Sequence, residues 1–259
     1  MKSITKINEN IIRLTIPYKD IYTTIYAIKT DGGYVLFDSA SYDEDIDAYV
    51  IPFLNELNVT KEELKYVFIS HNHTDHAGGL GAFMKAFPNT CIISRHPDII
   101  ERFKGYNTLL PQEESVILND LKIVTIIGHT ADSSAILDMR TNTLISGDGL
   151  QLHGIFGSGK WGSNISFPDT HIHEVNKLMQ MEIEHILTAH DYHPYGNSYV
   201  GKENVQNALN ACIEPLYKVR DMIINNHSLS DEEICALYNQ EKTPTLGEHV
   251  VTQVRKKLL

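Results

Sequence analysis

The chain has 259 residues, of which 42% are hydrophobic and 21% charged, so it can bury a sizeable core and is expected to be globular rather than disordered. Its net charge of −11 disfavours a general nucleic-acid binder, because an acidic surface repels phosphate backbones. The three cysteines are far apart and lack CxxC spacing, and no apolar stretch approaches the length of a membrane span. The polar N-terminus lacks the apolar core of a signal peptide. A cytoplasmic protein is therefore expected.

The first forty residues predict strands. The segments 11–17, 21–30 and 34–40 are rich in β-branched and aromatic residues, and the turn at 31–33 (Asp-Gly-Gly) joins the last two as a hairpin. Residues 43–58 predict an amphipathic helix with acidic residues in its first turn. Its apolar positions are Ile46, Val50, Phe53, Leu54 and Leu57.

The middle of the chain alternates between strands and helices. Residues 65–70 predict a buried strand, 79–87 a short helix, 90–94 a strand and 97–104 a helical stretch. Further strands are predicted over 114–118, over 121–128 and over 183–190, the last two leading up to His129 and ending at His190. A hairpin of two strands is predicted from 133 to Asp148, with its turn at Thr141-Asn142. A helix over 169–181 is expected to have Asp169 or Thr170 as its cap.

From about residue 201 the pattern is helical, with segments at 228–240 and 246–259. The whole pattern predicts an α/β fold with two β-sheets covered by helices. We expect one domain over 1–200 and a helical C-terminal extension over 201–259 that packs on it.

Residues 70–80, SHNHTDHAGGL, contain His71, His73, Asp75 and His76 within six positions, directly after a predicted strand. Such a cluster has no packing purpose there, and imidazole and carboxylate together suit zinc, or less specifically manganese or iron. The cluster therefore predicts a metal site, and Gly78 and Gly79 are expected to let the loop turn tightly into the next helix.

Three more ligand-type residues, His129, Asp148 and His190, are each expected immediately after an apolar strand, where side chains from several strands can converge. Singly, each is more simply a surface or turn residue. Together with the cluster they make seven protein ligands, as many as two divalent ions need.

The other histidines form weaker candidates. His171 and His173 lie two apart on a predicted helix and so point to different faces. His153 and His193 follow Asp148 and His190 closely, and either a contact to ligands or substrate or a plain surface position fits them. The remaining histidines have no polar cluster around them: His96, His185, His227 and His249.

Several motifs resemble those of the metallo-β-lactamase-fold hydrolases. HNHTDH is similar to the H-x-H-x-D-H motif of that superfamily, GHTADSSAIL to its third-histidine segment, LISGD to the strand that ends in a bridging aspartate, and ILTAH to the strand that ends in the last histidine. YVLFDSA resembles the early strand ending in Asp-Ser/Thr-Gly, with Ala40 where glycine is usual.

The resemblance implies a four-layer αβ/βα sandwich of two mixed sheets, with two divalent ions at one edge. His71, His73 and His129 would hold the first ion; Asp75, His76 and His190 would hold the second. Asp148 would bridge the two ions, and Asp75 and Asp148 are the carboxylates expected to serve catalysis. Two such ions can activate a bridging hydroxide, which favours hydrolysis.

The resemblance leaves several substrates open. A small ester, thioester or lactone is expected, in the manner of glyoxalase II or the lactonases, and 69 residues beyond His190 are more like the glyoxalase II plan. The alternatives are a phosphodiesterase or nuclease of the same fold and a metal-binding module without turnover. The glycine-rich segment 149–170, which contains Trp161, is expected either to cover the metals or to be a plain connection. The expected partner is a small-molecule substrate, with no nucleic acid and no membrane; the oligomeric state is left open.

Overall fold

The computed structural model describes residues 2–155, 162–192, 196–240 and 246–259. Trp161 and His193, for which the sequence predicts roles near the site, lie outside the described residues. The chain divides into two compact units, Met1–Val124 and Thr125–Leu259, and each is described by itself.

The first unit contains a seven-stranded sheet with its strands in chain order. Strands β1 to β4 pair in an antiparallel manner and β4 to β7 in parallel, so the sheet is mixed. The strands are β1 (Ser3–Lys6), β2 (Ile11–Tyr18), β3 (Ile21–Thr30), β4 (Gly33–Phe37), β5 (Leu64–Ile69), β6 (Cys91–Ser94) and β7 (Thr108–Leu109). The predicted hairpin between β3 and β4 is confirmed, and Gly33 has a φ of 126° there.

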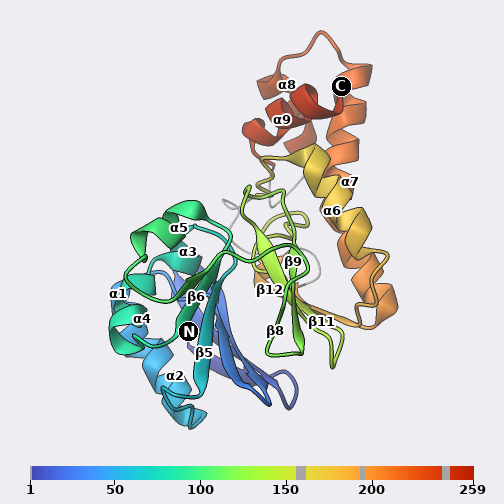
Figure 1. The fold of residues 1–259 in the computed structure, drawn as a ribbon. Coiled ribbons are helices and arrows are strands. Elements are labelled where there is room, and N and C mark those ends of the chain that lie inside the picture. Colours follow the sequence, from blue (N-terminus) through green and yellow to red (C-terminus); the bar gives the residue numbers. More distant parts are fainter. Residues whose placement is uncertain (1, 156–161, 193–195, 241–245) are drawn as a thin grey trace. The chain divides into compact units, whose positions relative to one another are not determined.

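Helices cover one face of this sheet (Figure 1). They are α1 (Asp43–Asp45), the π-helical turn η1 (Ile46–Val50), α2 (Ile51–Glu56), α3 (Thr74–Ala77), α4 (Leu80–Ala86) and α5 (Pro97–Arg102). The amphipathic helix predicted over 43–58 is therefore three consecutive helical segments. Pro52 lies in the first turn of α2, where its missing N–H costs little. The predicted apolar face packs into the core with the strands.

The second sheet has six strands in the order β13-β12-β11-β10-β9-β8 and is also mixed, because β11 and β12 are parallel and its other described pairs are antiparallel. The strands are β8 (Val116–Ile117), β9 (Leu121–Thr125), β10 (Ser134–Asp138), β11 (Thr143–Ile145), β12 (His185–Tyr192) and β13 (Gly196–Val200). The boundary between the two units falls within β9.

Three strand ends differ from the predicted ones. β9 ends at Thr125 and not next to His129, since the Ile126 N–H bonds to the Ser133 carbonyl in a loop. β11 ends at Ile145, and the following turn is closed by a bond from the Gly149 N–H to the Ser146 carbonyl, so Asp148 lies in the turn. His190 lies inside β12, whose register against β13 shifts between Leu187 and Tyr192.

The second unit also contains the helices α6 (Pro168–Leu178), α7 (Lys202–Asn225), α8 (Asp231–Asn239) and α9 (Glu248–Leu258). The predicted cap of α6 at Asp169 or Thr170 is wrong: the helix begins at Pro168, a residue favoured in the first turn, and Phe167 precedes it without a side-chain cap. The predicted 228–240 segment contains α8, which begins with a capping box formed by Ser230 and Glu233.

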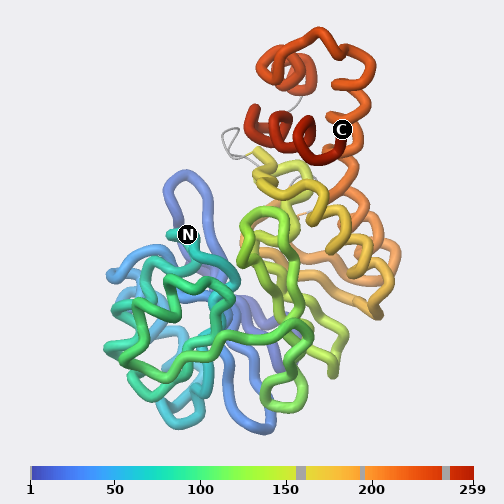
Figure 2. Tube along the Cα trace, turned by 45° about the horizontal axis from the view of Figure 1, so that its top comes forward, coloured from blue at the N-terminus to red at the C-terminus, as the bar shows by residue number. Residues whose placement is uncertain are grey.

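The C-terminal helices pack together around their own apolar cluster, which includes Leu216, Tyr238 and Val250, with Ile165 beside them. Figure 2 shows α8 and α9 in red next to α7 in orange. The two mixed sheets with their helices confirm the predicted α/β class, and the helices near the C-terminus are present. Among the described residues, no helix has both the length and the apolar character needed to cross a membrane.

Candidate metal centre

The histidine cluster begins where β5 ends, and its second half forms the short helix α3. Nε2 of His71 lies 3.0 Å from Nδ1 of His73, and Nδ1 of His71 lies 3.1 Å from Oγ of Ser70. His71, Asp75 and His76 are buried, whereas His73 lies nearer the surface. Burying polar side chains is costly unless they are hydrogen-bonded or paired, so the cluster depends on its partners.

Asp38, the aspartate of the YVLFDSA motif just after β4, lies against the cluster, although the sequence assigned it no contact there. Its fully buried carboxylate accepts hydrogen bonds from the Ser70 N–H (2.8 Å), from Ser70 Oγ (3.0 Å) and from Nδ1 of His76 (2.7 Å). Burial raises the pKa of the Asp38 carboxyl, and the bonds from His76 and Ser70 oppose that rise. Because Nδ1 of His76 faces this carboxylate, Nε2 is the ring atom that can act as a ligand.

Gly78 and Gly79 form the turn that leads into α4, as expected, and they lie against residues 39–42; neither has a left-handed backbone. Gly78 has a helical φ of −65° and Gly79 a φ of −80°. A Cβ at Gly78 would lie 1.9 Å from the Ser41 carbonyl oxygen, and one at Gly79 would lie 2.4 Å from that of Ser39. Ser39 donates through both N–H (2.8 Å) and Oγ (3.0 Å) to the His76 carbonyl, so the two glycines permit a close backbone approach.

Ala40 lies at the centre of this approach. Its φ is 68°, in the left-handed region that favours glycine, and its carbonyl accepts the Gly79 N–H at 3.2 Å. The alanine found where glycine is usual therefore occupies a strained backbone position.

In the second unit, Asp148 lies between two histidines. Its Oδ1 is 3.2 Å from Nε2 of His190, and its Oδ2 is 3.7 Å from Nε2 of His129. Nδ1 of His129 lies 2.7 Å from the Asn164 carbonyl oxygen, which can only accept, so Nδ1 carries the proton and Nε2 is the ligand atom. All three side chains are buried.

Tyr192 and Gln151 are further residues that the sequence did not identify. The Tyr192 hydroxyl is 3.0 Å from Oδ1 of Asp148, and Nε2 of Gln151 is 3.1 Å from that hydroxyl. Tyr192 lies two residues after His190 on β12, so the alternation of a strand could have indicated that the two share a face.

The other described histidines have different surroundings. His171 is buried and His173 exposed on α6, as their spacing predicted. Burial lowers the pKa of His171 to about 4, so its ring is neutral at pH 7. His96 caps α5 through the Asp98 N–H, and His185 bonds to Ser198 on β13. His153 is half-buried near Gln151, and its role stays a prediction.

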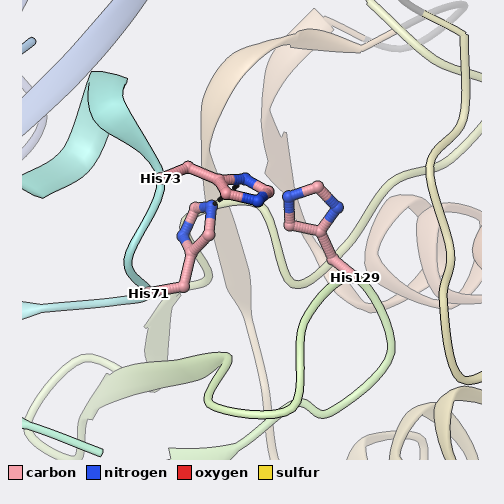
Figure 3. Close-up of side chains that lie close together, drawn as sticks. All are labelled: His71, His73 and His129. Atoms are coloured by element: carbon pink, nitrogen blue, oxygen red, sulfur yellow. Dashed lines mark hydrogen bonds between the residues drawn. The ribbon is translucent and has the colours of Figure 1, made fainter. Parts of the chain in front are cut away.

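Two groups of side chains have the atom types and the spacing that could hold a metal ion. Within each group the candidate ligand atoms lie within 4.8 Å of one another. The groups are His71, His73 and His129, and Asp75, His76, Asp148 and His190. Figure 3 shows the three imidazole rings of the first group and the hydrogen bond between His71 and His73. Their roles as ligands, and the bridging role of Asp148, stay predictions.

Known proteins share parts of this sequence and its fold. The uncharacterized protein YobT of Bacillus subtilis is 26% identical over 52% of this chain and 66% of its own length. Hydroxyacylglutathione hydrolase 1 of Vibrio vulnificus is 27% identical over 61% of each chain. The match thus spans less than two thirds of either relative.

Solved structures show the same fold. The crystal structure of DIM-1 metallo-beta-lactamase superposes with a TM-score of 0.63 and 15% identity over 82% of this chain and 96% of that one. A model of the metallo-beta-lactamase superfamily matches residues 18–190, a range that contains both groups of ligand-type side chains. The chain therefore belongs to the metallo-beta-lactamase superfamily.

Proposed function

We propose that this protein is a binuclear metal-dependent hydrolase that cleaves a small ester, thioester or lactone. The observation that carries the proposal is the donor set: five imidazoles and two carboxylates in two groups, each group within the spacing of a metal site. Such donors favour zinc, with manganese or iron as alternatives. When bound, two divalent ions would supply an activated water and polarise the substrate's carbonyl oxygen.

The chain's own residues fit this role. A metal-binding histidine usually donates its other ring N–H to a carboxylate or a carbonyl, which fixes its orientation and raises its basicity. His76 is held in this way by Asp38, and His129 by the Asn164 carbonyl. In the proposed assignment, His71, His73 and His129 would hold one ion, Asp75, His76 and His190 would hold the other, and Asp148 would serve as a ligand to both. Asp75 and Asp148 would thereby contact the reacting groups through the metals.

The name of one relative supports the substrate class. Hydroxyacylglutathione hydrolase 1 acts, by its name, on an acylglutathione, which is a thioester, and it matches 61% of this chain. The net charge of −11 argues in the same direction, because it disfavours RNA or DNA as the substrate. The three cysteines are free, which fits the proposed cytoplasmic location. We further propose that residues 201–259 are a helical extension that packs on a domain over 1–200.

A substrate panel tests the proposal. Acid release would be measured from activated esters, thioesters and lactones, and phosphate-ester cleavage from a bis-aryl phosphodiester and from RNA, each with zinc and with a chelator. We expect metal-dependent turnover of a carbonyl substrate that is lost in His71→Ala. The control variant His227→Ala should keep this activity, because the His227 side chain is exposed between α7 and α8. Faster cleavage of the phosphodiester or of RNA would favour a nuclease, and no turnover of any substrate by metal-loaded protein would favour a binding module.

A further inference from the structure

Gln151 occupies the centre of a buried hydrogen-bond network in the second unit. Only 3% of its surface is exposed, and each polar atom of its side chain has a partner. Oε1 accepts the backbone N–H of Asn164 at 3.0 Å, and Nε2 lies 2.9 Å from the Asp148 carbonyl oxygen and 3.1 Å from the Tyr192 hydroxyl. One side chain therefore connects the segment of Asp148 with the segment of Asn164.

These contacts fix the direction of each proton. The Asn164 N–H is a donor, so the amide oxygen of Gln151 must face it, and the amide nitrogen must face Asp148 and Tyr192. Since that nitrogen can only donate, the Tyr192 hydroxyl accepts from it. The hydroxyl then directs its own proton to Oδ1 of Asp148, 3.0 Å away. The Asp148 carboxylate is thus oriented by a donor whose direction Gln151 sets.

Asn164 extends the network to His129 and to the C-terminal helix. Its carbonyl oxygen accepts from Nδ1 of His129 at 2.7 Å, and its side-chain Oδ1 lies 2.6 Å from Nε2 of His249 near the start of α9. Asn164 is consequently held at three atoms, by Gln151, His129 and His249. His249 is exposed, whereas the rest of the network lies deeper, so it forms the outer end of the chain of bonds.

We propose that Gln151, Tyr192 and Asn164 are positioning residues that hold Asp148 and His129 in one hydrogen-bonded frame, and that α9 belongs to this frame through His249. The C-terminal helix would then fix the ring of His129 from a position 120 residues along the chain. The expected effect on metal binding rests on the proposed function, but the frame itself exists without metal. It can therefore be tested on metal-free protein.

The first test follows the His129 ring proton by ¹H–¹⁵N NMR in metal-free protein. We expect a signal from Nδ1–H that exchanges slowly with water and that His249→Leu and Asn164→Ala accelerate by about tenfold. His249→Gln keeps a donor and should retain slow exchange, as should the exposed control His227→Leu. Unchanged exchange in both His249→Leu and Asn164→Ala would overturn the role of α9.

The second test measures zinc affinity by competition with a chromophoric chelator. Tyr192→Phe removes only the hydroxyl, and it should weaken binding by about 10- to 100-fold while the unfolding midpoint of the metal-free protein stays near that of the wild type. Wild-type affinity in Tyr192→Phe and in Gln151→Met would overturn the frame around Asp148. Failure of the wild type itself to bind metal would refute the proposed function, and the NMR test would still decide whether the frame exists.

Discussion

Replacing Gly78 by alanine should destabilise the protein, although alanine is the better helix former. A Cβ at this position would lie 1.9 Å from the Ser41 carbonyl oxygen and 2.5 Å from that of Thr74. Real Cβ contacts essentially never fall below 3.0 Å, so the two backbones would have to separate by roughly 1 Å. Both clashing atoms belong to the backbone, which cannot rotate out of the way.

The expected loss is about 3 kcal/mol in the free energy of unfolding, the upper end of the range for overpacking. The separation would also pull Ser39 away from the His76 carbonyl, so zinc affinity should fall as well. Gly81 on α4 is the matched control, because a Cβ there would have only Asp43 Oδ1 near it, at 3.9 Å. Gly81→Ala should raise stability by up to about 1 kcal/mol. Urea unfolding of metal-free protein measures both variants, and a Gly78→Ala protein as stable as the wild type would refute the close approach.

Two further predictions concern charge. Asp148→Asn removes a negative charge from between the two proposed cations, so the variant should lose one metal preferentially and need a higher pH for activity. A variant that retains two ions and an unchanged pH–rate profile would show that Asp148 is only a turn residue. The pKa of His171 is about 4 in the folded state, below its unfolded value near 6.5, so the unfolded chain binds more protons between these two pH values. The stability that comes from the neutral ring is complete above pH 6.5 and is lost as the pH falls toward 4. Between pH 7 and pH 5 the wild type should lose about 2 kcal/mol more than His171→Leu in metal-free urea titrations, and equal losses would contradict the burial of a neutral ring.

The ligand-type residues and the α/β class could be predicted from the sequence because their signals are local. Four ligand-type side chains within residues 71–76 form one motif, and the hairpin at 31–33 needs only its turn residues. The strand ends before His129 and Asp148 could not be placed, since the apolar pattern runs through Ile126 and Ile127 although the backbone already turns to bond with Ser133.

The supporting residues were hidden for a different reason. The sequence places Asp38 in the YVLFDSA motif but not beside His76, which is 38 residues away, and Gln151 and Asn164 are joined only by the fold. Each is an ordinary polar residue whose partner lies far away in the sequence, so no spacing marks it. The sequence indicated that Gly78 and Gly79 are special. Glycine is needed there because the backbone of residues 39–42, which follow β4, approaches closely, and not because of the glycines' own torsion angles.

Metal content tests the central proposal most directly. Protein reconstituted with zinc and freed of excess ion should carry two ions per chain, and His71→Ala and His190→Ala should each carry one, lost from the first and the second group respectively. A fluorescence or elemental assay measures the number of zinc ions per chain, with His227→Ala as the control variant. One ion or none in the reconstituted wild type, or two in either ligand variant, would contradict the binuclear centre.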